Sequence, residues 1–576
     1  MCGIVGYKGE GDASEIVFKG LKKLEYRGYD SAGIATARES SVQVEKGEGT
    51  IDEVSPEPRE SQAGIGHTRW ATHGGVNDTN AHPHTDCSED IAVVHNGIIN
   101  NYEELRQELE RKDHSFKSET DTEVIPHLME EAVDDEKTLE AAAQRVADRL
   151  QGSYAVVAAF STGDIVAFKN ESPLVIGVGE EENFLASDVT PFLEHTDEAI
   201  FLEDGETAVL NGELKIFHEG KQVDKKPEKI DWDAEQASKE GHNHFMEKEI
   251  KEQSQTVKRA AFQDRSDMVK AVKMVEEAEN VYLTGCGTAS FASSLGAKYL
   301  RDTGIKTISE QAHELEYRAD EIGEEDLVIA VSQSGETADL LSMLKKVDAP
   351  VLAVVNVVGS TLARKSDHKI FVNAGPEIGV ASTKAFTAQV TALKLLKYTL
   401  QHRLEKGRKT LVETADKIEK VLEEQEETLE EISDYLLEKD HVFTIGRNKG
   451  HEMAKESALK LKELSYIHVE AFPGGEFKHG NLALVEDGVP VISFLKEESF
   501  DEILSNTLEA HSRGADIIGV GTEELENFKH FIRIPDDPNQ EILEVIPFQM
   551  IAYRTSIKKG NNPDKPRNLA KSVTVK

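Results

Sequence analysis

A short apolar run, a glycine and a helical segment follow one another twice in the second half of this chain. The first apolar run covers residues 280–284 before Gly285, and the second covers 441–445 before Gly446, 161 residues later. In each case further strand-like and helical segments alternate downstream. Such alternation is typical of parallel sheets covered on both faces by helices, and the offset is too long for a solenoid repeat. The sequence therefore predicts a duplicated α/β domain with doubly wound parallel sheets.

The first half of the chain has a different pattern. Short alternating or β-branched runs, such as 91–95 and 154–160, are interrupted by helical stretches around 102–111 and 123–132. This mixture predicts a strand-rich α+β domain. A polar span with little periodicity follows it and is interpreted as a linker.

These changes of pattern define the expected domain boundaries. Between the two α/β copies, apolar residues recur at helical spacing amid Glu and Lys, which predicts a long amphipathic connector. By composition alone, the tail rich in Asn, Pro and Lys would be disordered. We expect, in order, an N-terminal domain (1–217), a linker (218–245), the first α/β domain (246–405), a helical connector (406–431), the second α/β domain (432–557) and a C-terminal tail (558–576).

Composition narrows the classes of partner and compartment. The 576 residues include 107 Asp and Glu against 66 Lys and Arg, a net charge of −41, which argues against a nucleic-acid partner. Only three cysteines occur, too few for a disulfide framework, and this favours a reducing, intracellular environment. The chain lacks a secretion signal and any run of about 20 apolar residues. We therefore expect a cytoplasmic protein without a membrane partner.

Cys2 is the first candidate for chemistry. Its small side chain permits removal of Met1, after which Cys2 would carry both a thiol and a free α-amine. An α-amine with a pKa of about 7.7 to 8.0 can accept the proton of the thiol, so such a residue can be its own nucleophile and base. The alternative is a buried cysteine in an apolar N-terminal strand, and Cys2 alone leaves both interpretations open.

Four further motifs bear on this choice. They are Tyr-Arg-Gly-Tyr-Asp-Ser-Ala-Gly at 26–33, His-Thr-Arg-Trp-Ala-Thr-His at 67–73, His-Asn-Gly at 95–97 and Glu-Thr-Asp-Thr-Glu at 119–123. Together, in this order and separation, they resemble the class II glutamine amidotransferases, the N-terminal-nucleophile glutaminases. The resemblance implies an αββα fold for the N-terminal domain.

The resemblance also implies roles for individual residues. Cys2 would attack the side-chain amide of glutamine, forming a glutamyl thioester and releasing ammonia. Asn96 and the backbone N–H of Gly97 would form the oxyanion hole, a role suited to fixed donors. Arg69 would bind the α-carboxylate of glutamine, and Asp121 would bind its α-ammonium.

Five histidines lie in the stretch from His67 to His95, including the pair His82 and His84. No pattern of cysteines or carboxylates with ligand spacing accompanies them, so we expect no metal. They are expected to shape the glutamine pocket or to satisfy backbone groups of loops. Cys87, in an acidic loop, is interpreted as a bystander.

Two loops that follow strands of the first α/β copy are suited to an anion. The loop 285–290 lies between a strand and a helix, where backbone N–H groups and the helix dipole favour phosphate. It lacks the third glycine of a dinucleotide site and the Gly-Lys of a P-loop, and by itself it is equally a tight turn. The loop 332–337, Ser-Gln-Ser-Gly-Glu-Thr, adds three hydroxyls and an amide. The two loops resemble those of the sugar isomerase (SIS) domain, which binds phosphosugars.

The whole chain resembles the family of glutamine:fructose-6-phosphate aminotransferases (isomerising). The matching segments of the second half are 332–337, 377–384, 459–466, 476–480 and 569–575. The resemblance implies transfer of the amide nitrogen of L-glutamine to fructose 6-phosphate and isomerisation to glucosamine 6-phosphate, the first step of hexosamine (UDP-N-acetylglucosamine) biosynthesis. It also implies internal passage of ammonia past a gate at Trp70, no external cofactor, and a homodimer.

In the second half, the resemblance implies a sugar site built from several segments. Lys571, in a tail that enters the site, would form a Schiff base with C2 of the opened sugar. His479, contributed across a subunit interface, would open the ring. Glu463 would move the proton between C1 and C2, and Lys460, on the same helix face, would poise that carboxylate. The expected sugar-phosphate contacts are Thr288, Ser332, Gln333, Ser334, Thr337, Val380, Ser382 and Lys460.

Two features depart from the family pattern. Ala289 stands where relatives commonly have a phosphate-binding serine, so Ser290 would have to replace that contact, and the loop 472–475 (Phe-Pro-Gly-Gly) is atypical. Two other functions stay open. One is a glutaminase joined to an SIS domain that acts on another phosphosugar or in the deaminating direction. The other is a non-enzymatic sensor of sugar phosphates, against which the intact set of catalytic candidates argues.

Overall fold

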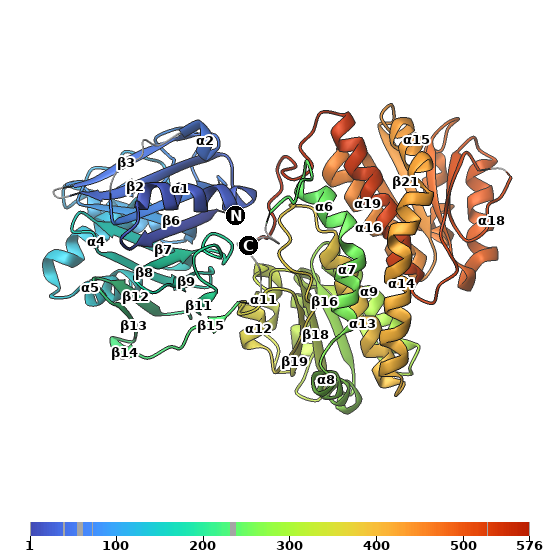
Figure 1. Ribbon diagram of the computed structural model, residues 1–576, viewed down its shortest axis with the longest axis horizontal. Helices are drawn as coiled ribbons and strands as arrows, with labels where there is room; N and C mark the ends of the chain where they lie inside the picture. The colour runs from blue at the N-terminus through green and yellow to red at the C-terminus, as the bar shows by residue number, and fades with distance from the viewer. Residues whose placement is uncertain are drawn as a thin grey trace. The chain divides into compact units, whose positions relative to one another are not determined.

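The computed structural model describes residues 2–38, 41–54, 61–71, 73–230, 238–526 and 528–574. The chain divides into two units, Met1–Ala237 with Ala570–Lys576, and Ser238–Leu569 (Figure 1). Among the helices of the described residues, none combines the length and the apolar character that a membrane crossing requires.

The N-terminal unit contains two antiparallel sheets. The first has the strand order β15-β11-β9-β10-β1-β4-β2-β3, and the second has the order β14-β13-β12-β8-β7-β6-β5. The strands of the first sheet are β1 (Gly3–Lys8), β2 (Ser31–Arg38), β3 (Ser41–Glu48), β4 (Ala63–Arg69), β9 (Val175–Val178), β10 (Asn183–Ala186), β11 (Glu198–Phe201) and β15 (Glu228–Lys229). Those of the second are β5 (His84–Thr85), β6 (Ile91–Ile99), β7 (Gly152–Phe160), β8 (Ile165–Asn170), β12 (Glu206–Leu210), β13 (Leu214–His218) and β14 (Lys221–Val223).

Helices cover the outer faces of both sheets, which gives four layers (Figure 1, blue to teal). One core fills the space between the sheets, with Ile4 and Ile65 from the first and Val157 from the second. A second core, which includes Leu128 and Val156, lies between the second sheet and its helices. The helices are α1 (Ala13–Leu24) and α2 (Ile51–Val54) near the first sheet, and α3 (Tyr102–Glu110), α4 (Val124–Asp135) and α5 (Leu139–Ala147) on the second, with the short η1 (Glu25–Arg27). The predicted αββα fold is confirmed.

Part of the expected linker at 218–245 belongs to these sheets. β14 forms a hairpin with β13, and β15 pairs with β11. The hairpin turns through Glu219 and Gly220, whose φ angles of 48° and 73° fit the tight turn that matches the twist of paired strands. Because both short strands are largely exposed, their polar composition did not reveal them. Residues 231–237 of that segment lie outside the described residues.

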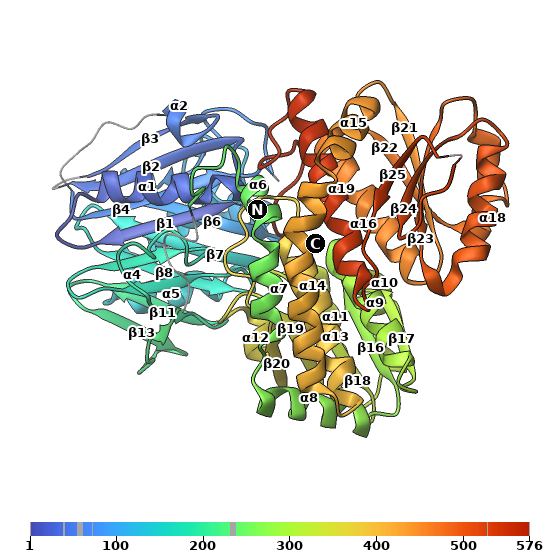
Figure 2. The same ribbon diagram turned by 45° about the vertical axis from the view of Figure 1, so that its right-hand side comes forward.

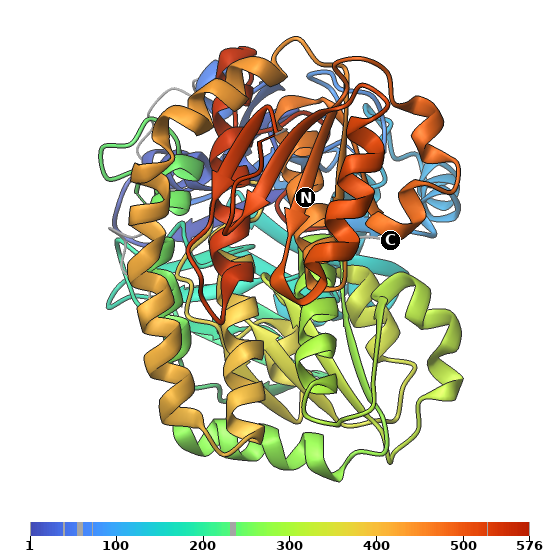
Figure 3. The same ribbon diagram turned by 90° about the vertical axis from the view of Figure 1, so that its right-hand side faces the viewer.

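The C-terminal unit contains two parallel five-stranded sheets with the same strand order (Figure 2). The first sheet runs β17-β16-β18-β19-β20 and the second runs β22-β21-β23-β24-β25 (Figure 3, orange and red strands). The predicted duplication and the doubly wound topology are confirmed. The strands are β16 (Val281–Gly285), β17 (Thr307–Gln311), β18 (Leu327–Ser332), β19 (Val351–Val355), β20 (His368–Phe371), β21 (His441–Gly446), β22 (His468–Pro473), β23 (Pro490–Leu495), β24 (Asp516–Gly521) and β25 (His530–Arg533).

Helices flank both parallel sheets and connect them. Those before and within the first copy are α6 (Phe245–Lys251), α7 (Gln253–Ala261), α8 (Arg265–Glu277), α9 (Thr288–Arg301), α10 (Ala312–Leu315), η3 (Glu316–Glu321), α11 (Ala338–Leu344), α12 (Thr361–Lys365) and α13 (Lys384–Leu400). Those of the second copy are α16 (Lys449–Ser465), α17 (Gly474–Phe477), η4 (Asn481–Leu484), η5 (Glu497–Ser499), α18 (Phe500–His511) and α19 (Gln540–Lys558). The buried apolar residues of the two copies form one continuous core.

The connector between the copies consists of two helices, α14 (Leu404–Glu424) and α15 (Glu426–Leu436), rather than one. Gln425, with φ −102° and ψ 6°, separates them. The predicted apolar face is buried, and Leu411, Ile418 and Leu429 are fully inaccessible. This face packs on α7 and α19, so the connector joins the cores of both copies.

The tail after α19 is anchored, although its composition favours disorder. Asp564 is only 6% exposed. Its carboxylate accepts the backbone N–H groups of Phe245 and Met246 at 2.9 and 2.8 Å, at the start of α6. Its carbonyl accepts the N–H of Val380 at 3.2 Å. Polar tail residues therefore bind backbone groups of the C-terminal unit, which composition alone cannot indicate.

Candidate functional site

Cys2 directly precedes β1, and the pairing of β1 with β4 places Gly3 opposite Thr68. This register brings the thiol to the end of β4, where the backbone N–H of Trp70 donates to Cys2 Sγ at 3.2 Å. Burial raises the pKa of the Cys2 thiol, while the N–H of Trp70 and the charge of Arg69 act in the opposite direction. The thiol therefore needs a base to become nucleophilic. The expected removal of Met1 concerns a residue outside those described.

Asn96, in β6, lies beside Cys2 in a fixed orientation. Its Nδ2 donates to the carbonyl of Cys2 at 2.9 Å, and its Oδ1 accepts from Nε2 of His67 at 3.0 Å. The next residue, Gly97, has a φ of 128°, and a Cβ there would lie 1.9 Å from the carbonyl oxygen of Ser153. Only glycine fits this position without moving the neighbouring strand. The two predicted oxyanion donors are thus held by the sheet itself.

Arg69 and Asp121, the predicted ligands of the glutamine backbone, are both 3% exposed. The guanidinium of Arg69 donates to three successive carbonyls of the loop 73–75, at 2.5, 3.2 and 3.2 Å. Burial lowers the pKa of Arg69, and the neighbouring carboxylates partly offset this effect. The carboxylate of Asp121 accepts the N–H of Ile99 at 2.8 Å. Asp121 is therefore fixed to β6, the strand that carries Asn96.

A layer of buried histidines supports this cluster. Burial lowers the pKa of all four members, to about 3 for His67, so they are neutral hydrogen-bonding groups at pH 7. His84 Nε2 lies 3.0 Å from Thr120 Oγ1, and His95 Nδ1 lies 2.9 Å from Thr122 Oγ1. These two threonines are the neighbours of Asp121 in the sequence. The members are His67, His82, His84 and His95. The sequence predicted that these histidines shape the glutamine pocket or satisfy backbone groups of loops. In the structure their partners are threonine hydroxyls, the side chain of Asn96 and a backbone carbonyl.

The motif at 26–33 supports Trp70. The ring of Tyr29 meets the Trp70 ring edge-on, with centroids 5.6 Å apart. The carboxylate of Asp30 accepts the N–H of Ala71 at 2.8 Å. A Cβ on Gly28 would lie 2.7 Å from the backbone of the residue before Trp70, so this close approach requires glycine. These contacts fix the chain on both sides of the predicted gate.

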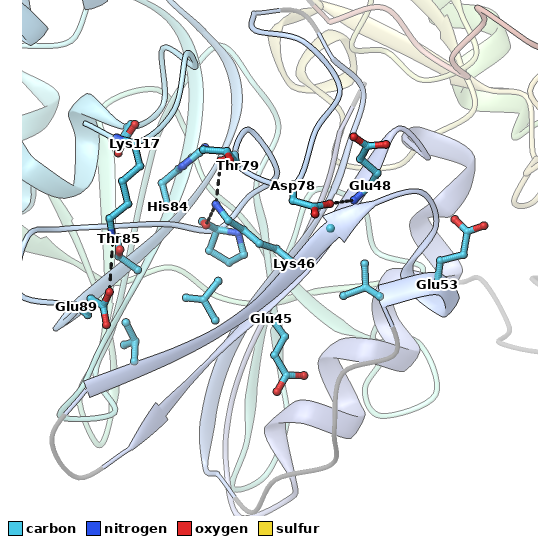
Figure 4. Close-up of a pocket in the computed structure, with 16 residues that line it drawn as sticks. Glu45, Lys46, Glu48, Glu53, Asp78, Thr79, His84, Thr85, Glu89 and Lys117 are labelled. Atoms are coloured by element: carbon cyan, nitrogen blue, oxygen red, sulfur yellow. Dashed lines mark hydrogen bonds and ion pairs between the residues drawn. The ribbon is translucent and has the colours of Figure 1, made fainter. Parts of the chain in front are cut away.

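A groove of about 1190 Å³ lies on the same unit and does not include Cys2 among its lining residues (Figure 4). Lys46 extends into its wall and donates to three carbonyls of the loop 79–83, at 3.2, 2.6 and 3.0 Å. Burial lowers the pKa of Lys46 to about 8. The same loop holds Asn80, which exchanges hydrogen bonds with Glu119 at 2.9 and 3.2 Å. Lys46 therefore braces the segment that leads to Asp121.

In the C-terminal unit, the strand order places a switch point between β16 and β18, where sheets of this kind bind ligands at the carboxyl ends of the strands. The loop after β16 turns through Gly287, with φ 53°, and α9 begins at Thr288. The loop after β18 contains the predicted segment 332–337. Because parallel strands end at the same edge, both predicted phosphate loops meet there.

The serines of the second loop shape its backbone. Ser332 Oγ accepts the N–H of Gly335 at 2.9 Å, and Ser334 Oγ accepts the N–H of Glu336 at 3.2 Å. Gly335 has a φ of 70°, and a Cβ there would lie 2.2 Å from Ser360 Oγ. A hydroxyl that accepts one bond retains its own proton as a donor. The loop is thus held in a form that can offer hydroxyl donors to an anion.

The other predicted phosphate contacts differ in their surroundings. Thr337 is the residue before α11, and its side chain makes no capping bond to that helix. Gln333 accepts the backbone N–H of Asn356 with its carbonyl at 3.3 Å. Ser290, the suggested substitute for a serine at Ala289, donates its hydroxyl to the carbonyl of Gly287 at 2.7 Å. That hydroxyl therefore already holds the turn.

The segment that carries Val380 and Ser382 is bound on two sides. The carboxylate of Glu377 accepts the Ser382 hydroxyl at 3.1 Å and two backbone N–H groups at the start of α13, each at 2.9 Å. Glu249, from α6, accepts the N–H groups of residues 378 and 379 at 2.5 and 3.2 Å. The bond from Val380 to Asp564 then attaches the tail to this segment.

Lys460 and the partly exposed Glu463 form an ion pair on α16, with Nζ and Oε2 2.6 Å apart. Lys460 is fully buried and also lies 3.5 Å from Oε1 of Glu456. Burial by itself would lower the pKa of Lys460, but the two carboxylates outweigh it and the net shift is upward. Burial raises the pKa of Glu456 to about 7. Glu456 is a titratable group of this cluster that the sequence did not single out, although its spacing from Lys460 places both on one helix face.

His479 and Lys571 come from other segments of the chain. His479 is exposed between α17 and η4, and its backbone N–H donates to the carbonyl of Glu476 at 2.9 Å. In the atypical loop before it, a Cβ on Gly474 would lie 2.6 Å from Ile503 Cδ1, so the glycine permits close packing on α18. Lys571 is partly buried in the closing segment that groups with the N-terminal unit.

The second parallel sheet lacks the hydroxyl loop at its switch point. There β23 is followed by Lys496, which is 4% exposed. Its Nζ lies 3.0 Å from Glu544 and 3.7 Å from Glu541, both on α19. Glu541 also pairs with Lys394 of α13 at 3.0 Å. A buried ion network therefore occupies this position, whereas the predicted phosphate loop belongs to the first copy.

Two family models match this chain. The glutamine amidotransferase domain matches residues 67–194, and the SIS domain matches residues 274–397 and 435–559. Together with the fold and the two clusters, these matches define the class: a glutamine amidotransferase domain followed by a tandem of SIS domains.

Curated relatives match the chain over its full length. Glutamine–fructose-6-phosphate aminotransferases (isomerizing) from Thermococcus kodakarensis and Halobacterium salinarum are 44% and 42% identical to it, each over 100% of both chains. Among solved structures, the C-terminal domain of glucosamine-fructose-6-phosphate aminotransferase from Francisella tularensis has a TM-score of 0.52 and 32% identity, covering 57% of this chain and 99% of that one. The chain belongs to the family of glutamine–fructose-6-phosphate aminotransferases (isomerizing), as the sequence motifs predicted.

Proposed function

We propose that this chain transfers the amide nitrogen of L-glutamine to fructose 6-phosphate and isomerises the product to glucosamine 6-phosphate, the entry to hexosamine synthesis. The observation that carries this proposal is the 44% identity to an aminotransferase of this specificity over the full length of both chains. The local geometry supports it, because the two half-reactions need a thiol beside fixed amide donors, a loop of hydroxyl groups at a switch point and a Lys–Glu ion pair.

In the glutaminase half, Cys2 Sγ attacks the amide carbon of glutamine after its proton passes to the α-amine of a trimmed chain. Asn96 Nδ2 and the N–H of Gly97 stabilise the oxyanion of the tetrahedral intermediate. Collapse of the intermediate expels ammonia and leaves a thioester, which water hydrolyses to glutamate. Arg69 and Asp121 hold the carboxylate and ammonium of the substrate, which selects free glutamine over a glutamine side chain in a peptide.

In the synthase half, hydroxyl and amide groups of the loop 332–337 and Thr288 bind the phosphate, while Val380 and Ser382 contact the sugar. Lys571 forms a Schiff base with C2 of the opened ketose, and ammonia displaces it. Glu463 then moves a proton from C1 to C2, and Lys460 Nζ, 2.6 Å from Glu463 Oε2, holds that carboxylate in position.

Two further residues complete the reaction: one for the passage of ammonia between the glutaminase and synthase sites, and one for opening of the sugar ring. Trp70 gates the passage of ammonia, which keeps a volatile nucleophile at high effective concentration. His479 acts as the acid and base for ring opening, and its exposure in a single chain fits a contribution across the interface of a homodimer.

The test is a coupled assay on protein whose N-terminus has been determined by mass spectrometry. With both substrates, the expected products are glucosamine 6-phosphate and glutamate in equal amounts. Cys2→Ala should abolish synthesis from glutamine but retain synthesis from ammonium, because the nucleophile serves only ammonia release. A different amino sugar, or full activity of protein that retains Met1, would contradict the proposal.

A further inference from the structure

Four potential metal ligands converge in the N-terminal unit. Cys87 lies in the turn between β5 and β6, His114 follows α3, and His127 and Glu130 lie one turn apart on α4. One ligand atom from each residue lies within 4.8 Å of those of the other three. These side chains come from three separate segments, so their convergence results from the tertiary fold.

The distances match a tetrahedral zinc ion. Zinc bonds of about 2.3 Å to sulfur and 2.0–2.1 Å to nitrogen or oxygen, at tetrahedral angles, place sulfur and nitrogen about 3.5 Å apart and nitrogen and oxygen about 3.3 Å apart. Cys87 Sγ lies 3.5 Å from Nδ1 of His114 and 3.6 Å from Nδ1 of His127. Glu130 Oε2 lies 3.2 and 3.6 Å from the same two nitrogens. Four of the six separations among these atoms thus match those of a tetrahedral zinc site, and all six are within 4.8 Å.

The surroundings favour a bound cation over a simple hydrogen-bonded group. Nε2 of His114, the nitrogen that faces away from the cluster, lies 3.5 Å from Oε1 of Glu131. A carboxylate in this place orients a metal-binding imidazole and raises its basicity.

We propose that Cys87, His114, His127 and Glu130 form a structural zinc site. One thiolate, two imidazoles and one carboxylate complete four-coordinate zinc and leave no open position for a substrate, which is the character of a structural site. The ion ties the turn before β6 to α4 and to the segment between α3 and α4. That segment carries Asp121, so zinc braces the glutaminase domain without contacting either substrate. Cys87 is then a ligand and not the bystander that the sequence indicated.

The test measures zinc in the full-length protein. The protein is stripped with a chelator, reloaded with Zn²⁺ and dialysed, and its zinc content and affinity are determined by elemental analysis and by competition with a chromophoric chelator. We expect one zinc per chain. Cys87→Ser and His114→Ala each weaken affinity by about 100-fold or more, and Glu131→Gln weakens it by about 10-fold, as for supporting groups of other metal sites. Cobalt in place of zinc should show a thiolate charge-transfer band that Cys87→Ser lacks.

The other two cysteines of the chain provide matched controls for Cys87. Cys2→Ser and Cys286→Ser should retain full zinc content, because neither thiol lies in the cluster. His195→Ala, which removes a histidine paired with a single glutamate at 3.4 Å, should also retain it. Zinc should raise the unfolding temperature of the wild type but not that of Cys87→Ser.

Two results would overturn the proposal. One is a zinc content of the reloaded wild type that does not exceed that of Cys87→Ser. The other is an unchanged affinity in both Cys87→Ser and His114→Ala. If either variant is unstable, zinc affinity is measured instead in Glu130→Gln, because Glu130 is partly exposed and its substitution disturbs the fold less. Zinc binding does not depend on the proposed reaction, and synthesis from ammonium, assayed alongside, reports on that reaction separately.

Discussion

Asn96→Ala tests whether the oxyanion donor of the glutaminase site has been identified correctly. The substitution removes the Nδ2 group that lies 2.9 Å from the carbonyl of Cys2. It also removes the acceptor of the bond from His67, which keeps its second contact to the carbonyl of His95 at 3.0 Å. The backbone N–H of Gly97 stays in place, so half of the predicted oxyanion hole survives.

These contacts set the expected magnitudes. Loss of one oxyanion donor typically lowers kcat by 100- to 1000-fold, or about 2.7–4 kcal/mol of transition-state stabilisation. Each of the two lost hydrogen bonds costs about 1 kcal/mol of folding free energy, so the variant should be destabilised by about 2 kcal/mol. The effect on catalysis should therefore exceed the effect on stability. The KM for glutamine should change little, because Arg69 and Asp121 bind the other end of the substrate.

The assay compares three rates: hydrolysis of glutamine, synthesis from glutamine, and synthesis from ammonium. The first two should fall together, and the third should not change. Asn101→Ala is a matched control, because Asn101 also donates to one carbonyl (2.9 Å) and accepts one backbone N–H (3.0 Å), at the start of α3. It should keep all three rates. A decrease in hydrolysis of less than tenfold, or a parallel decrease in synthesis from ammonium, would refute the assignment.

Three further predictions concern the C-terminal unit. The pKa of Glu456 is raised from 4.5 to about 7, so folding favours the protonated carboxyl. This contribution to the free energy of unfolding is complete below about pH 4.5 and is lost as pH rises through 7, a difference of about 3 kcal/mol. Glu456→Gln should therefore lack this decline when calorimetry is run from pH 5 to pH 8, and an identical decline would contradict the shift. Lys496→Met leaves the buried Glu544 without its lysine and Glu541 with Lys394 alone, so it should cost about 3–5 kcal/mol in denaturant unfolding, whereas an unchanged midpoint would show that the network is neutral. Gly335→Ala places a Cβ 2.2 Å from Ser360 Oγ at a φ of 70°, so the KM for fructose 6-phosphate should rise about tenfold while glutamine hydrolysis stays intact. An unchanged KM would exclude this loop from the phosphate site.

The divergence of the two SIS copies shows how one fold acquires different roles. Both sheets have the same strand order, and both have a loop at the same switch point. In the first copy that loop consists of small polar residues around Gly335, whereas in the second it begins with a lysine bound to glutamates of α19. The copies therefore share a core and differ in the chemistry of this loop, so the predicted phosphate loop has no counterpart of the same composition in the second copy.

The sequence alone determined the architecture and most of the candidate residues. The alternation of strands with helices, repeated after 161 residues, predicted both parallel sheets, and spaced motifs predicted the glutaminase domain. Such features can be recognised because burial follows local periods of two or about 3.6 residues, and because the motif residues lie in short loops next to strand ends. The pair Lys460 and Glu463 was predictable for the same reason, since three residues separate them on one helix.

Only the tertiary structure decided which distant residues meet. The histidine layer under Asn96, the hairpin at Glu219 and Gly220, and the anchoring of Asp564 depend on strand register and on packing between elements. The cluster of Cys87, His114 and His127 combines segments from a turn, a loop and a helix, and no spacing in the chain marks them as partners. Local periodicity states which face of an element is buried, whereas the identity of its neighbours follows from how whole layers pack together.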